Sequence, residues 1–154
     1  MSTVSELKYF ADRGFNNITY VSSLLLYIRL GIPFGTHQLH DLEEISKKIK
    51  VLCVLVDMKE HIDLLEKTDG KYQVFNKIDT GYHRAGLDAS KYEPIIELAK
   101  YINQSKNCSF LGLYSHAGHS YDQPTIEDVK RVAYEERGKR NYHSCYSRCN
   151  GKST

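Results

Sequence analysis

The chain has 154 residues, of which 41% are hydrophobic and 26% charged, with a formal net charge of +2. This size and composition are typical of one ordinary globular domain. Acidic and basic residues alternate along the chain, which argues against nucleic acid or an anionic membrane as a partner. The longest apolar run, Val21 to Phe34, contains Arg29 and is too short to span a bilayer. Without an apolar signal core at the N-terminus, we expect the cytoplasm, with Cys53 and Cys108 as buried free thiols.

The first half of the chain predicts two strands and two helices after a weakly patterned N-terminal segment, residues 1–24. Residues 27–33 (YIRLGIP) predict a strand that leads into an amphipathic helix beginning at Asp41. VLCVLVDM, residues 51–58, is a continuous apolar run of the kind found in parallel strands buried on both faces. Asp57 and Glu60 have the spacing of a capping box for the helical stretch that follows.

The second half predicts two more strands, residues 72–80 and 108–115, each followed by a helix. The first of these helices carries a second capping-box spacing, Ser90 with Glu93, and Thr125 with Asp128 has the spacing to cap the last helix. Alternation of strand and helix predicts βαβ units and a parallel sheet. The basic, polar residues 138–154 contain almost no aliphatic side chains, so we expect a disordered tail.

Polar side chains gather where two of these strands end. KIDTGYHRAG spans residues 77–86, and Lys77 and Asp79 alternate on one face of the strand. YSHAGHSY spans residues 114–121 and places three ring side chains, His116, His119 and Tyr121, just past the next strand. Because parallel α/β folds hold their active sites at the carboxyl ends of the strands, these two segments predict a functional site.

The two segments together resemble those of fold-type-III pyridoxal-phosphate enzymes, the group of alanine racemase, D-threonine aldolase and eukaryotic D-serine dehydratase. K-x-D-T-G-x-x-R-x-G is shared across that group, and the fuller forms KIDTGYHRAG and LYSHAGHSYD resemble fungal-type D-serine dehydratases. LGIPFGT followed by DLEEI is also similar, so the resemblance covers roughly residues 25–137. It implies an α/β fold, a partial (β/α) barrel of the alanine-racemase N-terminal-domain type with about strands three to six.

The resemblance also implies roles for individual residues. Arg84 matches an arginine near the phenolic oxygen of the cofactor or the carboxylate of the substrate, and a guanidinium suits both. His116 matches a residue that packs against the pyridine ring, and Tyr121 matches a tyrosine that lines the cofactor site. Lys77 and Asp79 would support Arg84 from the barrel interior. The implied reaction is the pyridoxal-phosphate- and zinc-dependent conversion of D-serine to pyruvate and ammonia.

Several parts of the family machinery have no match in this sequence: the Schiff-base lysine, the phosphate-binding loop and the zinc-binding His-x-Cys pair. His143-Ser144-Cys145 has the spacing of that pair but comes too early, so we assign no metal ligand. We therefore expect a truncated, inactive copy that binds pyridoxal phosphate and zinc poorly. A change of composition at Gly138 is typical of a frameshift, and Asn76 is unusual at a helix-facing strand position.

Other interpretations remain open. The family resemblance also fits a D-threonine aldolase-like lyase, a non-catalytic pyridoxal-phosphate binder of the related barrel family, or a family-type dimer. Without the resemblance, His116 is a hydrogen-bonded loop residue and Arg84 a surface charge. His37 and His40 are then loop residues before a helix, without a ligand partner.

Overall fold

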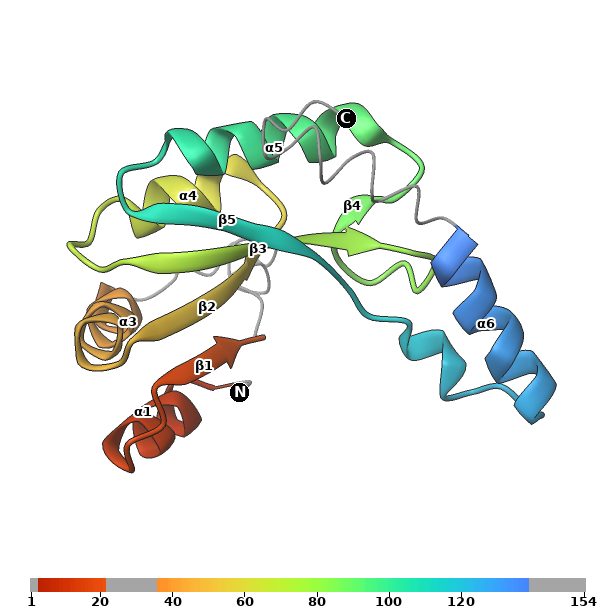
Figure 1. The fold of residues 1–154 in the computed structure, drawn as a ribbon, viewed down its shortest axis with the longest axis horizontal. Coiled ribbons are helices and arrows are strands. Elements are labelled where there is room, and N and C mark those ends of the chain that lie inside the picture. The colour runs from red at the N-terminus through yellow and green to blue at the C-terminus, as the bar shows by residue number, and fades with distance from the viewer. Residues whose placement is uncertain (1–2, 22–35, 139–154) are drawn as a thin grey trace.

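The computed structural model describes residues 3–21 and 36–138, and in them helices alternate with strands (Figure 1). The N-terminal half contains α1 (Val4–Asp12), β1 (Asn17–Tyr20), α3 (Thr36–Lys48), β2 (Val51–Val56) and α4 (Lys59–Leu65). The C-terminal half contains β3 (Tyr72–Asp79), β4 (Leu87–Asp88), α5 (Tyr92–Gln104), β5 (Cys108–Ser115), the 3-10 turn η1 (Gly118–Ser120) and α6 (Ile126–Gly138).

The strands form one parallel sheet in which β2 lies between β1 and β3, and β3 lies between β2 and β5. Ile78 pairs with Ser115 of β5 and also with Leu87 of β4. Since a strand has only two pairing sides, β4 extends the line of β2 beyond the point where β2 ends. Helices α1, α3, α4 and α5 follow one another along the convex side of this curved sheet (Figure 1). The arrangement is an arc of a (β/α) barrel, as the sequence predicts.

A bulge interrupts the pairing of β3 with β5. Val74 pairs with Phe110, but the next residue of β3, Phe75, pairs with Gly112, so Leu111 is an extra residue in β5. Beyond the bulge, Tyr114 lies on the same face as Phe75, and their ring centroids are 6.3 Å apart. Leu113 points to the other face and packs against the cluster that contains Ile78.

The core lies between the sheet and its helices. Alternate residues of β2, among them Leu52, Val54 and Val56, are buried there together with Leu42 of α3 and Ile62 of α4. β3 follows the same alternation, with one polar exception. The Asn76 side chain is fully buried and its Nδ2 donates to the carbonyl of Ile95 in α5, 3.1 Å away. This hydrogen bond joins β3 to α5 and accounts for the polar residue at a helix-facing position of the strand.

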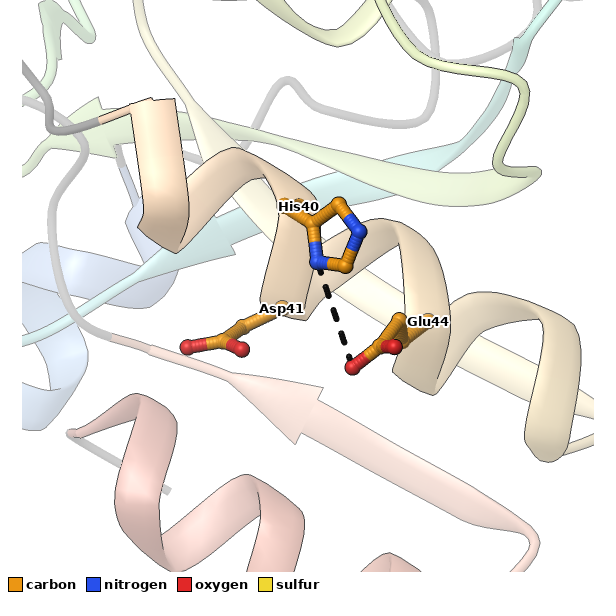
Figure 2. A group of neighbouring side chains, drawn as sticks. All are labelled: His40, Asp41 and Glu44. Atoms are coloured by element: carbon orange, nitrogen blue, oxygen red, sulfur yellow. Dashed lines mark ion pairs between the residues drawn. The ribbon is translucent and has the colours of Figure 1, made fainter.

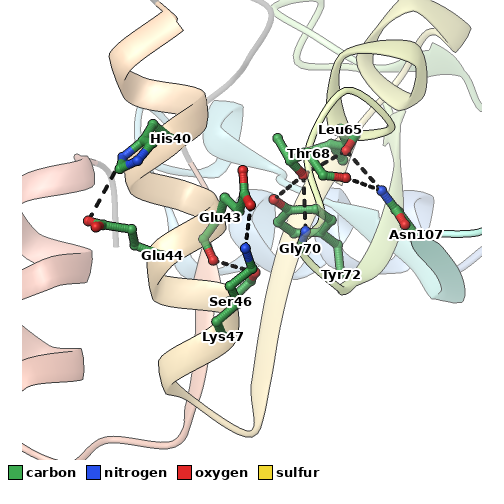
Figure 3. A network of polar contacts seen from close by, with 10 residues as sticks. All are labelled: His40, Glu43, Glu44, Ser46, Lys47, Leu65, Thr68, Gly70, Tyr72 and Asn107. Carbon is green, nitrogen blue, oxygen red and sulfur yellow. Dashed lines mark hydrogen bonds and ion pairs between the residues drawn. The ribbon is translucent and has the colours of Figure 1, made fainter.

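Three buried, uncharged side chains, Thr68, Tyr72 and Asn107, form a polar network at the amino-terminal end of the sheet (Figure 3). The Thr68 hydroxyl donates to the Leu65 carbonyl at 2.8 Å, so it accepts from the Tyr72 hydroxyl, also at 2.8 Å. Asn107, just before β5, donates from its amide nitrogen to the carbonyls of Thr68 and Leu65. Burial raises the pKa of the Tyr72 hydroxyl, which therefore remains neutral.

Close packing at Gly70 completes this network. A β-carbon on Gly70 would stand 2.4 Å from the Tyr72 hydroxyl and 2.5 Å from that of Ser46 in α3. These are sub-contact distances, so the turn between α4 and β3 accepts only glycine without rearrangement. The network thereby fixes where β3 begins relative to α3 and β5.

The predicted strands at residues 51–58, 72–80 and 108–115 are confirmed, and so are the helices that follow them. The weakly patterned N-terminal segment forms α1 and β1, and the Thr3 hydroxyl and Glu6 carboxylate cap α1 reciprocally. The strand predicted at residues 27–33 lies outside the described residues, and so do residues 139–154 of the tail predicted at 138–154, whereas Gly138 is the last residue of α6. Cys53 and Cys108 are buried free thiols, as expected.

Two of the three predicted helix caps are wrong. α4 begins after Met58 and α5 after Lys91, and neither has a side-chain cap. The Asp57 carboxylate accepts from the distant Gly86 amide instead, and the Ser90 hydroxyl donates to Asp88. The third prediction is confirmed, because the Thr125 hydroxyl accepts from the Asp128 amide at 3.1 Å. Among the described helices, none combines the length and apolar character needed to cross a membrane.

Candidate functional site

The candidate site lies at the carboxyl end of the sheet, where β3 and β5 stop side by side. Residues 80–86 leave β3 as a loop before β4, and residues 116–121 leave β5 through η1. Ile78 and Ser115 are register partners, so the two loops start from adjacent backbone positions. The pairing therefore brings the two polar segments that the sequence singled out to one place.

Asp79 shapes the first loop. Its Oδ1 accepts hydrogen bonds from the backbone amides of Gly81 at 2.9 Å and His83 at 3.0 Å. Its Oδ2 lies 3.4 Å from His83 Nδ1. Burial raises the pKa of the Asp79 carboxyl, but the two amide donors and His83 outweigh it and hold the pKa below its usual value. A charged carboxylate thus maintains a tight turn in which Gly81 has φ 127° and His83 φ 54°.

Tyr82 stands at the centre of the site. The guanidinium carbon of Arg84 lies 4.9 Å from the centroid of the Tyr82 ring. The His116 ring meets the same ring edge-on at 5.7 Å, and the His119 ring stacks on it at 6.2 Å. A β-carbon at Gly118 would come within 2.6 Å of Tyr82 and 2.9 Å of His116, so glycine is required for this contact. One phenol ring therefore joins the two loops.

Burial and the nearby cations favour the neutral form of the His116 imidazole. Burial lowers the pKa of His116, and the nearby cations Arg84 and Lys77 lower it further, while Glu136 acts in the opposite direction. Glu136 belongs to α6 and accepts from the hydroxyl of Ser115. A neutral imidazole presents an uncharged ring face, which suits contact with another flat ring.

Lys77 and Tyr121 belong to the same cluster but differ in their exposure to solvent. Lys77 lies in β3 on the face that carries Phe75, and only 7% of it is exposed. Tyr121 follows η1, contacts the His116 ring edge-on at 5.8 Å, and is 76% exposed. A buried positive charge thus acts on His116, and Tyr121 adds an accessible ring to the cluster.

The structure therefore brings together the residues that the sequence singled out. Arg84 and His116 meet around Tyr82, Tyr121 contacts His116, Lys77 acts on His116 electrostatically, and Asp79 holds the loop. Sequence reasoning assigned no role to Tyr82, although it lies inside KIDTGYHRAG. Its position between a cation and two imidazoles needs the pairing of β3 with β5, which no local pattern contains.

This set of side chains fits a pyridoxal group. Arg84 and Lys77 supply positive charge for anionic oxygens, and the neutral His116 and exposed Tyr121 supply ring faces. These residues would hold the flat, charged part of the cofactor.

The described residues of the candidate site include no group of three side chains close enough to share a metal ion. Within the described ranges, one group of side chains is close enough to share a metal ion, His40, Asp41 and Glu44 on α3 (Figure 2). His40 thus lies on a helix rather than in the expected loop, and its Nδ1 is 4.0 Å from Glu44. Asp41 is already 3.7 Å from the Lys8 ammonium of α1. The group is a surface ion-pair cluster, away from the rings of the candidate site.

Comparisons with known proteins agree with this architecture. The family described as "Alanine racemase, N-terminal domain" matches residues 30–143, which is well over half of the chain. A D-serine dehydratase of Dictyostelium discoideum is 34% identical over 146 residues, covering 88% of this chain and 34% of the relative. A D-serine dehydratase of Schizosaccharomyces pombe is 33% identical over 111 residues, covering 67% of this chain and 26% of that protein.

The similarity extends to solved structures. The D-threo-3-hydroxyaspartate dehydratase of Delftia sp. HT23 superposes with a TM-score of 0.77 at 21% identity, over 97% of this chain and 38% of that one. At this identity the superposition establishes the fold alone. The chain spans about one third of the length of these relatives or less.

Proposed function

We propose that this chain, which belongs to the alanine racemase N-terminal-domain family, forms the part of a pyridoxal-phosphate-binding barrel that holds the cofactor ring in a D-serine dehydratase. One observation carries the proposal: Arg84 and His116 meet around Tyr82 at the carboxyl ends of β3 and β5. The identity of 33–34% to two D-serine dehydratases supports D-serine as the substrate. The free, buried thiols support a reducing compartment such as the cytoplasm.

Each residue of the cluster has a distinct part in this proposal. Arg84 holds an anionic oxygen of the cofactor or of the substrate carboxylate, because its guanidinium is permanently charged. His116 offers its neutral ring face, and Tyr82 keeps both side chains in place. Lys77 and Asp79 support Arg84 in this role, Lys77 by adding positive charge for the same anionic ligand and Asp79 by fixing the loop that carries Arg84.

The bound pyridoxal group supplies an electron sink for negative charge at the α-carbon of the amino acid. The chain's own contribution is to orient that group and to keep positive charge beside its anionic oxygens. We assign the buried Lys77 to this electrostatic support and not to a covalent bond with the cofactor. We also assign zinc to none of the described residues, since their single candidate group lies on the surface of α3.

Titration with pyridoxal phosphate, followed by visible absorbance, tests the proposal. We expect weak, saturable binding that Arg84→Ala reduces by about tenfold, the value of one charge-assisted contact of about 1.4 kcal/mol. Arg131→Ala is the matched control, because it removes a guanidinium that is paired with Asp128 on the exposed side of α6. Equal affinities of these two variants would refute the cofactor site.

Two further readouts separate the alternatives. Borohydride treatment should leave no reduced adduct on Lys77, and a stoichiometric adduct there would contradict its assignment. Pyruvate formation from D-serine with zinc present would make the chain itself an enzyme. Cleavage of D-threonine in preference would favour an aldolase, and binding without turnover would favour a non-catalytic cofactor binder.

A further inference from the structure

Asp57 directly follows β2 and is hydrogen-bonded to the loop that carries Arg84. Its Oδ2 accepts a hydrogen bond from the backbone amide of Gly86 at 3.0 Å, across 29 positions of the chain. Gly86 comes two residues after Arg84. The loop is thus tied at its start to the carboxylate of Asp79 and at its end to that of Asp57.

Burial makes the second tie strong. The Asp57 side chain is 2% exposed, and its Oδ1 lies 3.6 Å from Nδ1 of the fully buried His61 in α4. A buried carboxylate needs such contacts, since an isolated charge away from water is very costly. The two oxygens therefore face different partners, one towards the helix and one towards the loop.

The backbone at Gly86, which the Asp57 carboxylate holds, lies directly against β3. Gly86 has φ +116°, and a β-carbon there would stand 2.6 Å from the carbonyl carbon of Ile78. The chain is therefore pressed directly onto β3, where Leu87 then pairs with Ile78. A backbone held this closely at Gly86 leaves little freedom to the two residues before it.

From this geometry we infer that Asp57 is a positioning residue for the ligand-binding site, which holds the loop of residues 80–86 so that Arg84 stays over Tyr82. The effect of Asp57 on a ligand rests on the proposed function. Its effect on the loop does not, and the two are measured separately below.

Amide hydrogen exchange on the whole chain tests the loop without any ligand. We expect protection of the Gly86 amide in the parent chain, exchange about tenfold faster in Asp57→Ala, and an intermediate rate in Asp57→Asn, whose oxygen is a neutral acceptor. The amides of β3 should not change. Glu60→Ala, an acid in the first turn of α4, is the matched control. Fast exchange at Gly86 in the parent would overturn the inference.

A double-mutant cycle with pyridoxal phosphate as the probe tests the link to Arg84. We expect Asp57→Ala to weaken binding, and Arg84→Ala to weaken it much less in the Asp57→Ala background than in the parent. Additive effects would show that Asp57 does not act through Arg84. If Asp57→Ala does not fold, both the exchange and the binding measurements are made on Asp57→Asn. An exchange rate of the Gly86 amide in Asp57→Asn equal to that of the parent would then refute the hydrogen bond as a restraint on the loop. A loosened loop without any binding in the parent would refute the proposed function alone.

Discussion

The two ends of the parallel sheet carry polar side chains of different kinds. At the amino end, Thr68, Tyr72 and Asn107 are buried, neutral and bonded to one another or to backbone carbonyls (Figure 3). At the carboxyl end, the cationic Arg84 lies against a ring, and Tyr121 is 76% exposed. The first network joins parts of the scaffold, whereas the second presents charge and ring faces for a ligand.

This division follows from the physics of parallel strands. All their carboxyl ends meet at one edge, where successive loops bring together residues distant in sequence. The opposite edge is free to serve stability, since hydrogen bonds there need not be available to a ligand. We therefore expect changes in the amino-end network to alter mainly the free energy of unfolding, and changes of the ring and cation side chains at the carboxyl end to alter mainly binding and titration.

The largest expected effect is at the amino end. Asn107→Ala removes an amide that donates to two buried carbonyls and accepts from Lys71. Unsatisfied buried groups cost about 1–3 kcal/mol each, so we expect a loss of about 3 kcal/mol in the free energy of unfolding, measured by urea denaturation. Gln104→Ala, on the exposed side of α5, should change it by less than about 0.5 kcal/mol. Similar losses in both variants would contradict the structural role of the network.

Gly86→Ala should have an intermediate effect. It places a β-carbon against the backbone of Ile78 at a residue with φ +116°. Gly14→Ala is the matched control, because Gly14 has φ +85° but no atom within 4 Å of an added β-carbon. Left-handed backbone alone costs about 1 kcal/mol, so we expect about 1 kcal/mol for Gly14→Ala and at least about 2 kcal/mol for Gly86→Ala. Equal losses would show that close packing on β3 contributes nothing.

The smallest effect concerns the titration of His116. Because burial and then Arg84 lower its pKa, Arg84→Ala should raise the pKa of His116 towards its usual value of 6.5. As the pH falls below that value, the unfolded chain binds more protons than the folded one, so His116 reduces stability in acid and Arg84→Ala lessens this loss. Proton NMR titration of the His116 ring measures the shift, and an unchanged or lower pKa would place Arg84 away from it.

The sequence alone predicts the strands and the position of the polar cluster at their carboxyl ends. β5 was predicted with its observed bounds, because an apolar run between polar segments is a strong signal for a buried strand. The motif residues of the site were also located, because the polar clusters directly follow the strands. The four-residue β1 was missed, since so short a strand gives too little pattern to recognise.

Tertiary contacts decided the features that the sequence could not give. Asp57 has the spacing of a local helix cap, but the competing amide of Gly86 belongs to a loop 29 positions away. Asn76 is unusual at a helix-facing strand position, and its amide nitrogen donates a hydrogen bond to the carbonyl of Ile95 in α5. The sequence indicates no role for Tyr82, because its contact with His116 exists only in the folded structure. In each case at least one partner lies too far along the chain for a local sequence pattern to indicate the contact.

The bulge at Leu111 determines which way the end of β5 faces. Side chains on a strand alternate, so one additional residue exchanges inside and outside for every position that follows it. If the same sequence paired with β3 without the bulge, Leu111 would stand opposite Phe75, Leu113 would lie on the concave face opposite Lys77, and Tyr114 would face α5 opposite Ile78. Because Leu111 is left without a partner in β3, the residues after it keep the alternation that leads to the observed position of the His116 imidazole.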